Sequence, residues 1–214
     1  MTPPAIILGF RRPRHQKQLQ GGSPTSETDC GPRSVIVAAE AASHGGIVVD
    51  QSEGPRWVRL LRREMDEPRG GTTLIQHETA LQSTLMDGAM LAVGRPDVRV
   101  ILGTMAHRAC AELLQEGRAL IVLIDYGRLN DLMPRLSGSP TYRGLHFVTL
   151  VGHGEDAHGT DWTYLYDPLH DGRRPGIPRG VQSVRIERYL RAAETAGTPK
   201  AGPGRAKVAI VRSM

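Results

Sequence analysis

Residues 146–168 of this chain read HFVTLVGHGEDAHGTDWTYLYDP, two apolar runs on either side of a polar segment rich in glycine and aspartate. The runs His146–Val151 and Trp162–Asp167 have the length and the β-branched or aromatic content of strands, and 152–161 has the composition of a connecting loop. Together they predict an antiparallel hairpin in the second half of the chain.

The register of this hairpin decides which polar residues meet. If Val151 pairs with Trp162, then His146 lies directly opposite Asp167, with Cβ atoms about 5 Å apart. A carboxylate in that position can hold an imidazole in one tautomer, which is the task of the third member of a nucleophilic triad. The alternative is an ordinary polar pair across the rim of a sheet.

The remaining pattern indicates helices first and a sheet afterwards. From Ser34 the apolar residues recur at helical spacing, and 50–118 is predicted to be a mainly helical insertion containing a short strand at Val98–Leu102. The second half is rich in predicted strands: Ala119–Tyr126, Gln182–Ile186 and Lys207–Val211. A flexible loop is predicted at 195–205, before the last of them. We therefore expect one α+β domain over 1–214.

A candidate nucleophile lies just before the first helix. Cys30 belongs to the run Asp29-Cys30-Gly31-Pro32, and a helix N-terminus stabilises a thiolate and offers free N–H groups to a developing oxyanion. Pro suits the first helical turn, and Gly would let a substrate approach closely. The alternative is a buried structural cysteine. Cys110, the other cysteine of the chain, lies on an apolar helix face and is expected in the core.

These motifs resemble the papain-like peptidases that process bacteriocin leaders at double-glycine sites, and their stand-alone, phage-borne relatives. The resemblance runs from the Asp-Cys-Gly-Pro motif through Gly117 and the following strand to His146-Phe147-Val148 and Tyr166-Asp167-Pro168, over roughly residues 18–190. It implies a papain-like fold in which the nucleophile helix packs on a C-terminal antiparallel sheet. It also implies Cys30 as nucleophile, His146 as base, Asp167 as its orienting partner, and no cofactor.

The oxyanion-hole glutamine departs from the family pattern. The family has this residue about six positions before the nucleophile, where this chain has Pro24. Gln20 is our candidate for the role, and Gln18 is the alternative.

Charge and composition indicate few other partners. The net charge is +5, and basic residues gather in a predicted solvated arm at 1–17, without the stacking or groove-reading element that nucleic-acid binding requires. Histidines and aspartates near the hairpin loop could form a metal site, but their irregular spacing favours solvated loop residues; they are His153, Asp156, His158, Asp161 and His170. We expect neither a nucleic-acid partner nor a metal.

No apolar stretch reaches the roughly 20 residues of a transmembrane helix, and no signal peptide is recognisable at the N-terminus. We expect synthesis in the cytoplasm, with release by lysis or carriage in a virion. The leading hypothesis is a cysteine peptidase or amidase, with cell-wall peptide (peptidoglycan) as substrate class. The alternative is a non-catalytic structural or binding protein, such as a virion tail component with virion protein partners.

Overall fold

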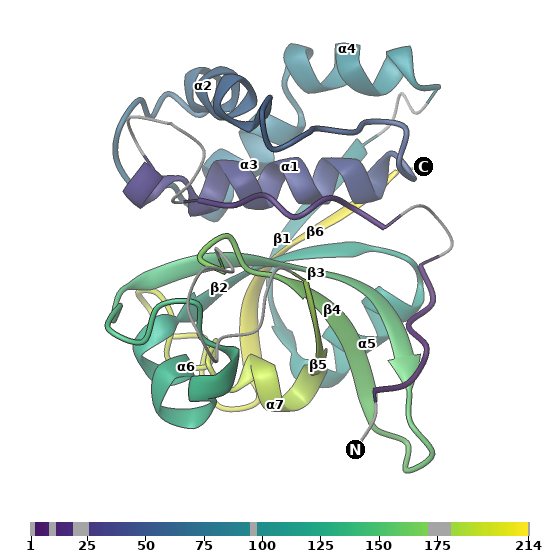
Figure 1. Cartoon of the computed structure of the whole chain (residues 1–214), viewed down its shortest axis with the longest axis vertical. Coiled ribbons are helices and arrows are strands. Elements are labelled where there is room, and N and C mark those ends of the chain that lie inside the picture. The colour runs from purple at the N-terminus through teal and green to yellow at the C-terminus, as the bar shows by residue number, and fades with distance from the viewer. Residues whose placement is uncertain (1–2, 9–11, 19–25, 95–97, 171–180, 214) are drawn as a thin grey trace.

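A six-stranded antiparallel sheet forms the middle layer of the molecule (Figure 1). The computed structural model describes residues 3–8, 12–18, 26–94, 98–170 and 181–213. In spatial order the strands are β1 (Val98–Ala106), β6 (Arg205–Ser213), β2 (Ala119–Asp125), β3 (Leu145–Glu155), β4 (Asp161–Tyr166) and β5 (Gln182–Arg185). The last strand in the sequence, β6, therefore lies between β1 and β2. The sheet is complete only when this C-terminal strand has paired with both neighbours.

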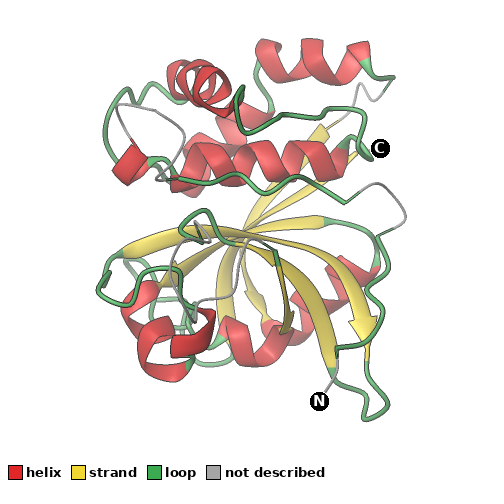
Figure 2. Cartoon of the chain, in the orientation of Figure 1, coloured by secondary structure: helices red, strands yellow, loops and turns green. Residues whose placement is uncertain are grey.

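Helices cover both faces of the sheet (Figure 2). On one face lie α1 (Cys30–Ala42), α2 (Gly54–Glu64), α3 (Leu74–Leu81) and α4 (Thr84–Ala92). On the other lie α5 (His107–Gln115), α6 (Tyr126–Leu132) and α7 (Ile186–Leu190), and short 3₁₀ turns occur at Ser26–Thr28 and Pro134–Leu136. The prediction of an α+β fold, with the helix that carries the nucleophile packed on an antiparallel sheet, is confirmed.

Each face of the sheet has its own apolar core. Along β2, Ile121 packs toward α1, whereas Leu120 and Val122 pack toward the opposite helices. Because both faces are buried, this strand is a continuous apolar run rather than an alternating one. Helix α1 is itself buried from Gly31 to Ala42, since it lies between the sheet and the helices above it. It is therefore buried all round, and the single apolar face predicted from its spacing understates its burial.

Local pattern misjudged several element boundaries. Helix α1 begins at Cys30, four residues before the predicted start. The predicted insertion at 50–118 contains a strand, β1, that is nine residues long and pairs with β6 along its whole length. Partners about 100 residues apart cannot be inferred from local periodicity.

The hairpin register differs from the predicted one by two residues. Near its open end Thr149 pairs with Tyr166 and Val151 with Tyr164. The strands extend farther into the predicted loop, and a bulge after Val151 includes Gly152, whose φ of 76° suits glycine. His146 and Asp167 are thus offset rather than directly opposite. Because strand side chains alternate with a period of two, the even shift leaves both on the same face.

The N-terminal residues do not form the predicted solvated arm. Within 12–18 the chain lies along the molecule: the Gln16 amide donates to the carbonyl oxygen of Val49 (2.7 Å), and the guanidinium of Arg12 lies 4.0 Å from the centre of the Tyr164 ring. Arg14 pairs with Asp50. The side chains of Arg12 and Arg14 therefore have partners within the fold. In the part of the chain that the structure describes, no helix has both the length and the apolarity to cross a bilayer.

Candidate active site

Cys30 is the first residue of α1 and lies at the edge of a pocket of about 590 Å³. The helix is fixed on the sheet partly by Thr149 of β3, whose hydroxyl donates to the carbonyl oxygen of Ser34 (3.0 Å). Cys30 is half-buried as a residue, in contrast to the fully buried Cys110. The placement of Cys110 in the core is therefore confirmed, and the structure does not bury Cys30 as a purely structural cysteine.

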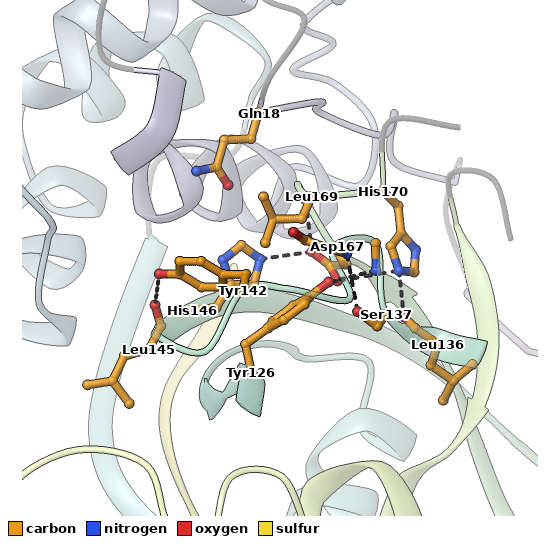
Figure 3. Close-up of polar contacts among 12 residues, drawn as sticks. Gln18, Tyr126, Leu136, Ser137, Tyr142, Leu145, His146, Asp167, Leu169 and His170 are labelled. Atoms are coloured by element: carbon orange, nitrogen blue, oxygen red, sulfur yellow. Dashed lines mark hydrogen bonds and ion pairs between the residues drawn. The ribbon is translucent and has the colours of Figure 1, made fainter. Parts of the chain in front are cut away.

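His146 is the second residue of β3 and is 1% exposed. Its Nε2 forms a 2.8 Å hydrogen bond with Oδ1 of Asp167, which follows β4 and is fully buried (Figure 3). With Nε2 engaged by the carboxylate, Nδ1 is the ring nitrogen left for the Cys30 thiol, which interacts with His146. The structure brings together all three residues predicted to act in catalysis.

The electrostatics of the three groups favour a thiolate–imidazolium pair. Burial raises the pKa of the Cys30 thiol, but the charge and hydrogen bond of His146 and the N–H groups of Phe147 and Gly31 lower it to a net value below the usual one. Burial lowers the pKa of His146, whereas Asp167 and Cys30 raise it to about 9. Burial raises the pKa of Cys110 to about 11, so that thiol stays protonated.

Two donors besides His146 bind the carboxylate of Asp167. The Tyr126 hydroxyl donates to Oδ2 (2.8 Å), and the backbone N–H of Leu169 donates to Oδ1 (2.9 Å). His170 lies 3.5 Å from Oδ2 (Figure 3). Although burial raises the pKa of Asp167, His170, His146 and the Leu169 N–H lower it well below its ordinary value. The carboxylate is therefore ionised and fixed in orientation.

Gln18 lies beside the same group, on the side of α1 (Figure 3). Its backbone N–H donates to the carbonyl oxygen of Pro168 (2.8 Å), and its side-chain Nε2 donates to the carbonyl oxygen of Glu27 (2.8 Å). The residue is 2% exposed. Gln20, the preferred sequence candidate for the oxyanion hole, lies outside the described residues. Gln18, the alternative candidate, is described and lies in this region.

The pocket beside Cys30 is mainly apolar. Its floor comes from β2, β3 and β6, and its walls come from residues 71–75 and the 197–198 segment. Leu145 and Ile75 line it although they are 49% and 66% exposed.

The 195–205 segment, predicted as a flexible loop, supplies part of a pocket wall through Gly197 and Thr198. Within it, Gly202 donates its N–H to the carbonyl oxygen of Glu194 (3.0 Å).

The residues considered for a metal site are engaged elsewhere. Asp161 bonds His153 (2.7 Å), Asp156 accepts from the Trp162 indole N–H (3.1 Å), and His170 lies beside Asp167. Over the described ranges, no group of three or more histidine, cysteine, aspartate or glutamate side chains is arranged to hold a metal ion.

Three residues near the site were missed at the level of sequence. Tyr126 was included in the strand Ala119–Tyr126, yet it is the first residue of α6 and bonds Asp167. Thr72 and His77 form a hydrogen-bonded pair at the pocket wall. Tyr126 could have been found from the pairing of β2 with β3. Ile124 lies opposite His146, so Tyr126, two residues farther along, lies close to that histidine.

Comparison with known proteins finds a structural likeness. No protein-family model and no curated protein sequence matches the chain. A solved structure described as a "putative C39-like peptidase" from Bacillus anthracis aligns over the full length of both chains, with 15% sequence identity and a TM-score of 0.47.

Proposed function

We propose that this protein is a cysteine peptidase or amidase in which Cys30 is the nucleophile, His146 the general base and acid, and Asp167 the group that orients His146. The observation that carries the proposal is the buried His146–Asp167 hydrogen bond (2.8 Å) beside a half-buried cysteine that lines a pocket. A merely structural cysteine needs neither the acid–base pair nor the pocket.

The reaction begins from the thiolate–imidazolium pair. The Cys30 sulfur attacks the carbonyl carbon of the scissile amide, a C–S bond forms, and the π electrons move onto the carbonyl oxygen. As the C–N bond breaks, His146 gives its proton to the leaving amine and an acyl-thioester remains. His146 then takes a proton from water, whose oxygen attacks the thioester, and the thiolate leaves with the carboxylic acid as product.

Gln18 is the side-chain donor that we assign to the oxyanion. One N–H of its amide is given to Glu27, which fixes the side chain, and the second N–H remains to be donated. The helix N-terminus at Cys30 supplies backbone N–H groups for the same charge. Replacing Gln18 by Ala should lower kcat about 10²- to 10³-fold with little change in KM. Gln20→Ala is the matched control for the other candidate.

A peptide with an apolar side chain is the substrate class that the pocket favours. Leu74, Ile75, Leu145 and Phe147 line it, and Lys207 is its one charged residue among those described. Cell-wall peptide stays the leading hypothesis for the natural substrate. Incubation with sacculi should release new amino groups, and a lack of release would remove the cell-wall hypothesis but not the peptidase.

The decisive test uses a thiol-directed acylating probe and a peptide library. Wild-type protein should form a covalent adduct at Cys30 and release new amino groups, whereas Cys30→Ala should do neither. Cys110→Ala is the matched control and should behave as wild type, because Cys110 is buried in the second core. Slow, equal labelling of both thiols would favour the alternative of a non-catalytic structural or binding protein.

A further inference from the structure

A buried histidine lies directly behind the wall of the pocket. His77 of α3 is fully buried, its Nε2 is 2.7 Å from the hydroxyl oxygen of Thr72, and its ring meets that of Phe147 edge to face at 4.3 Å. Thr72 and Phe147 both line the pocket that contains Cys30. The mechanism proposed above uses neither Thr72 nor His77.

This pair packs on the backbone of the nucleophile itself. A Cβ atom at position 31 would collide with the Thr72 hydroxyl and with Nε2 of His77. Gly31 therefore leaves room for the chain's own side chains, and not, as its sequence context predicted, for a substrate. The Thr72 hydroxyl is consequently held against the peptide that follows Cys30.

The direction of the Thr72–His77 hydrogen bond follows from what surrounds the imidazole. Burial lowers the pKa of His77 to about 3, so the ring is neutral and carries one N–H. Its Nδ1 is buried and has no hydrogen-bond partner among the described residues. A buried N–H without an acceptor is rarer in proteins than a lone pair without a donor. The proton therefore belongs on Nε2, which donates to the Thr72 oxygen.

A hydroxyl that accepts from His77 keeps its own hydrogen for another acceptor. We propose that Thr72 donates this hydrogen to a substrate carbonyl oxygen, that of the amide adjoining the scissile bond on the acyl side, and that His77 is a positioning residue that fixes the direction. The acyl side is assigned because Thr72 packs on the peptide next to the sulfur that carries the acyl group. The inference rests on the proposed function and makes the site selective for peptidyl over simple acyl groups.

The kinetic test compares two esters that acylate thiols. N-benzoylglycine p-nitrophenyl ester has the amide carbonyl, and p-nitrophenyl acetate lacks it. Thr72→Val keeps the shape of the side chain and removes the hydroxyl, so it should slow acylation by the first ester about fivefold to tenfold. Acylation by p-nitrophenyl acetate and alkylation by iodoacetamide should change less than about twofold, since neither needs that hydrogen bond.

Thr72→Ser is the matched control, because it keeps the hydroxyl and should restore the wild-type preference for the peptidyl ester. If Thr72→Val slowed both esters equally, or if Thr72→Ser failed to restore the preference, the substrate contact would be wrong. A wild-type protein that neither ester acylates would instead overturn the proposed function, and the substrate contact with it.

A second measurement reads the proton directly and needs no activity. Long-range ¹H–¹⁵N correlation spectra of histidine-labelled protein distinguish a protonated ring nitrogen from a bare one. The imidazole whose signals move in Thr72→Val is His77. Its Nε2 should carry the proton at pH 5 to 8, where the depressed pKa keeps the ring neutral. A proton on Nδ1 would overturn the inference while leaving the proposed peptidase intact.

Discussion

At the scale of single residues, Asp167 is the best-held group of the site. It accepts from His146 and the Leu169 N–H on one oxygen and from the Tyr126 hydroxyl on the other. The Tyr126 oxygen in turn accepts the backbone N–H of Gly138 (2.7 Å). Such a chain fixes the carboxylate, and through it the imidazole, because each member has its partner in a region that excludes water.

Removing one hydrogen bond of this chain should lower both the stability of the protein and the reactivity of Cys30. Tyr126→Phe leaves Oδ2 of Asp167 without its donor, so the free energy of unfolding should fall by about 1–3 kcal/mol and acylation of Cys30 should slow. Tyr189→Phe is the matched control, since that tyrosine is equally buried and its hydroxyl has no hydrogen-bond partner among the described residues. Urea unfolding and ester acylation provide the two readings. Equal losses in both variants would contradict the role of Tyr126.

The thiol itself should react at a pH where ordinary cysteines do not. His146 holds the pKa of Cys30 below its usual value, and burial raises that of Cys110 to about 11. Near pH 6, iodoacetamide should therefore label Cys30 quickly and Cys110 slowly. His146→Ala removes the imidazolium, so the midpoint of labelling at Cys30 should move to higher pH. Mass spectrometry of peptides from both sites reads the result, and an unchanged midpoint would exclude pairing with His146.

At the scale of elements, a buried arginine ties α2 to the start of α1. Arg62 donates to Oδ1 of Asp29 through Nε (3.1 Å) and Nη2 (3.0 Å), and to the carbonyl oxygens of Thr28, Glu67 and Gly70. Asp29 precedes the nucleophile, and Gly70 adjoins the pocket wall. One side chain thus sets the distance between the thiol and the wall opposite it.

Removing both partners of this pair should cost less than the sum of the two single losses. Arg62→Met removes the guanidinium that binds Oδ1 of the buried Asp29 carboxylate, which should lower the free energy of unfolding by about 3–5 kcal/mol. The double variant with Asp29→Ala should lose less than the sum of the two single losses. Arg108→Met, in an ion pair whose side chains are 90% and 57% exposed, is the control and should leave urea unfolding unchanged. Additive losses would mean that the pair is not coupled.

At the scale of the whole molecule, the site lies where α1 meets the ends of β3 and β4, so its charges are coupled to global stability. The folded pKa of Asp167 is lowered, and its contribution is present above the unfolded value of about 3.9 and is lost as the pH falls. The folded pKa of His146 is raised, and its contribution is complete below the unfolded value of about 6.5 and is lost as the pH rises.

The pH dependence of unfolding should therefore show a plateau. In a Cys30→Ala background, which removes the thiolate from the titration, we compare Asp167 with Asp167→Asn by urea unfolding. The stability advantage of Asp167 should be greatest between about pH 4 and 6.5 and should shrink on both sides. A difference that does not vary from pH 3 to 9 would show that the two groups are not paired.

The sequence by itself determined the α+β plan and the three residues assigned to catalysis. Continuous apolar runs such as Ala119–Tyr126 are strong signals because burial of both faces selects for them. His146 and Asp167 could be placed on one face even though the predicted register was wrong by two residues, since an even shift preserves the alternation of side chains. Cys30 could be located because a thiol followed by Gly-Pro signals the start of a helix.

Only the tertiary structure decided the groups that support these three. Tyr126, Thr72 and His77 reach the site through segments whose paths depend on long-range packing, and no local period marks them. The pairing of β1 with β6 is equally invisible in the sequence, because the partners are about 100 residues apart. Periodicity reports which residues are buried; which buried groups meet is decided by how the layers pack.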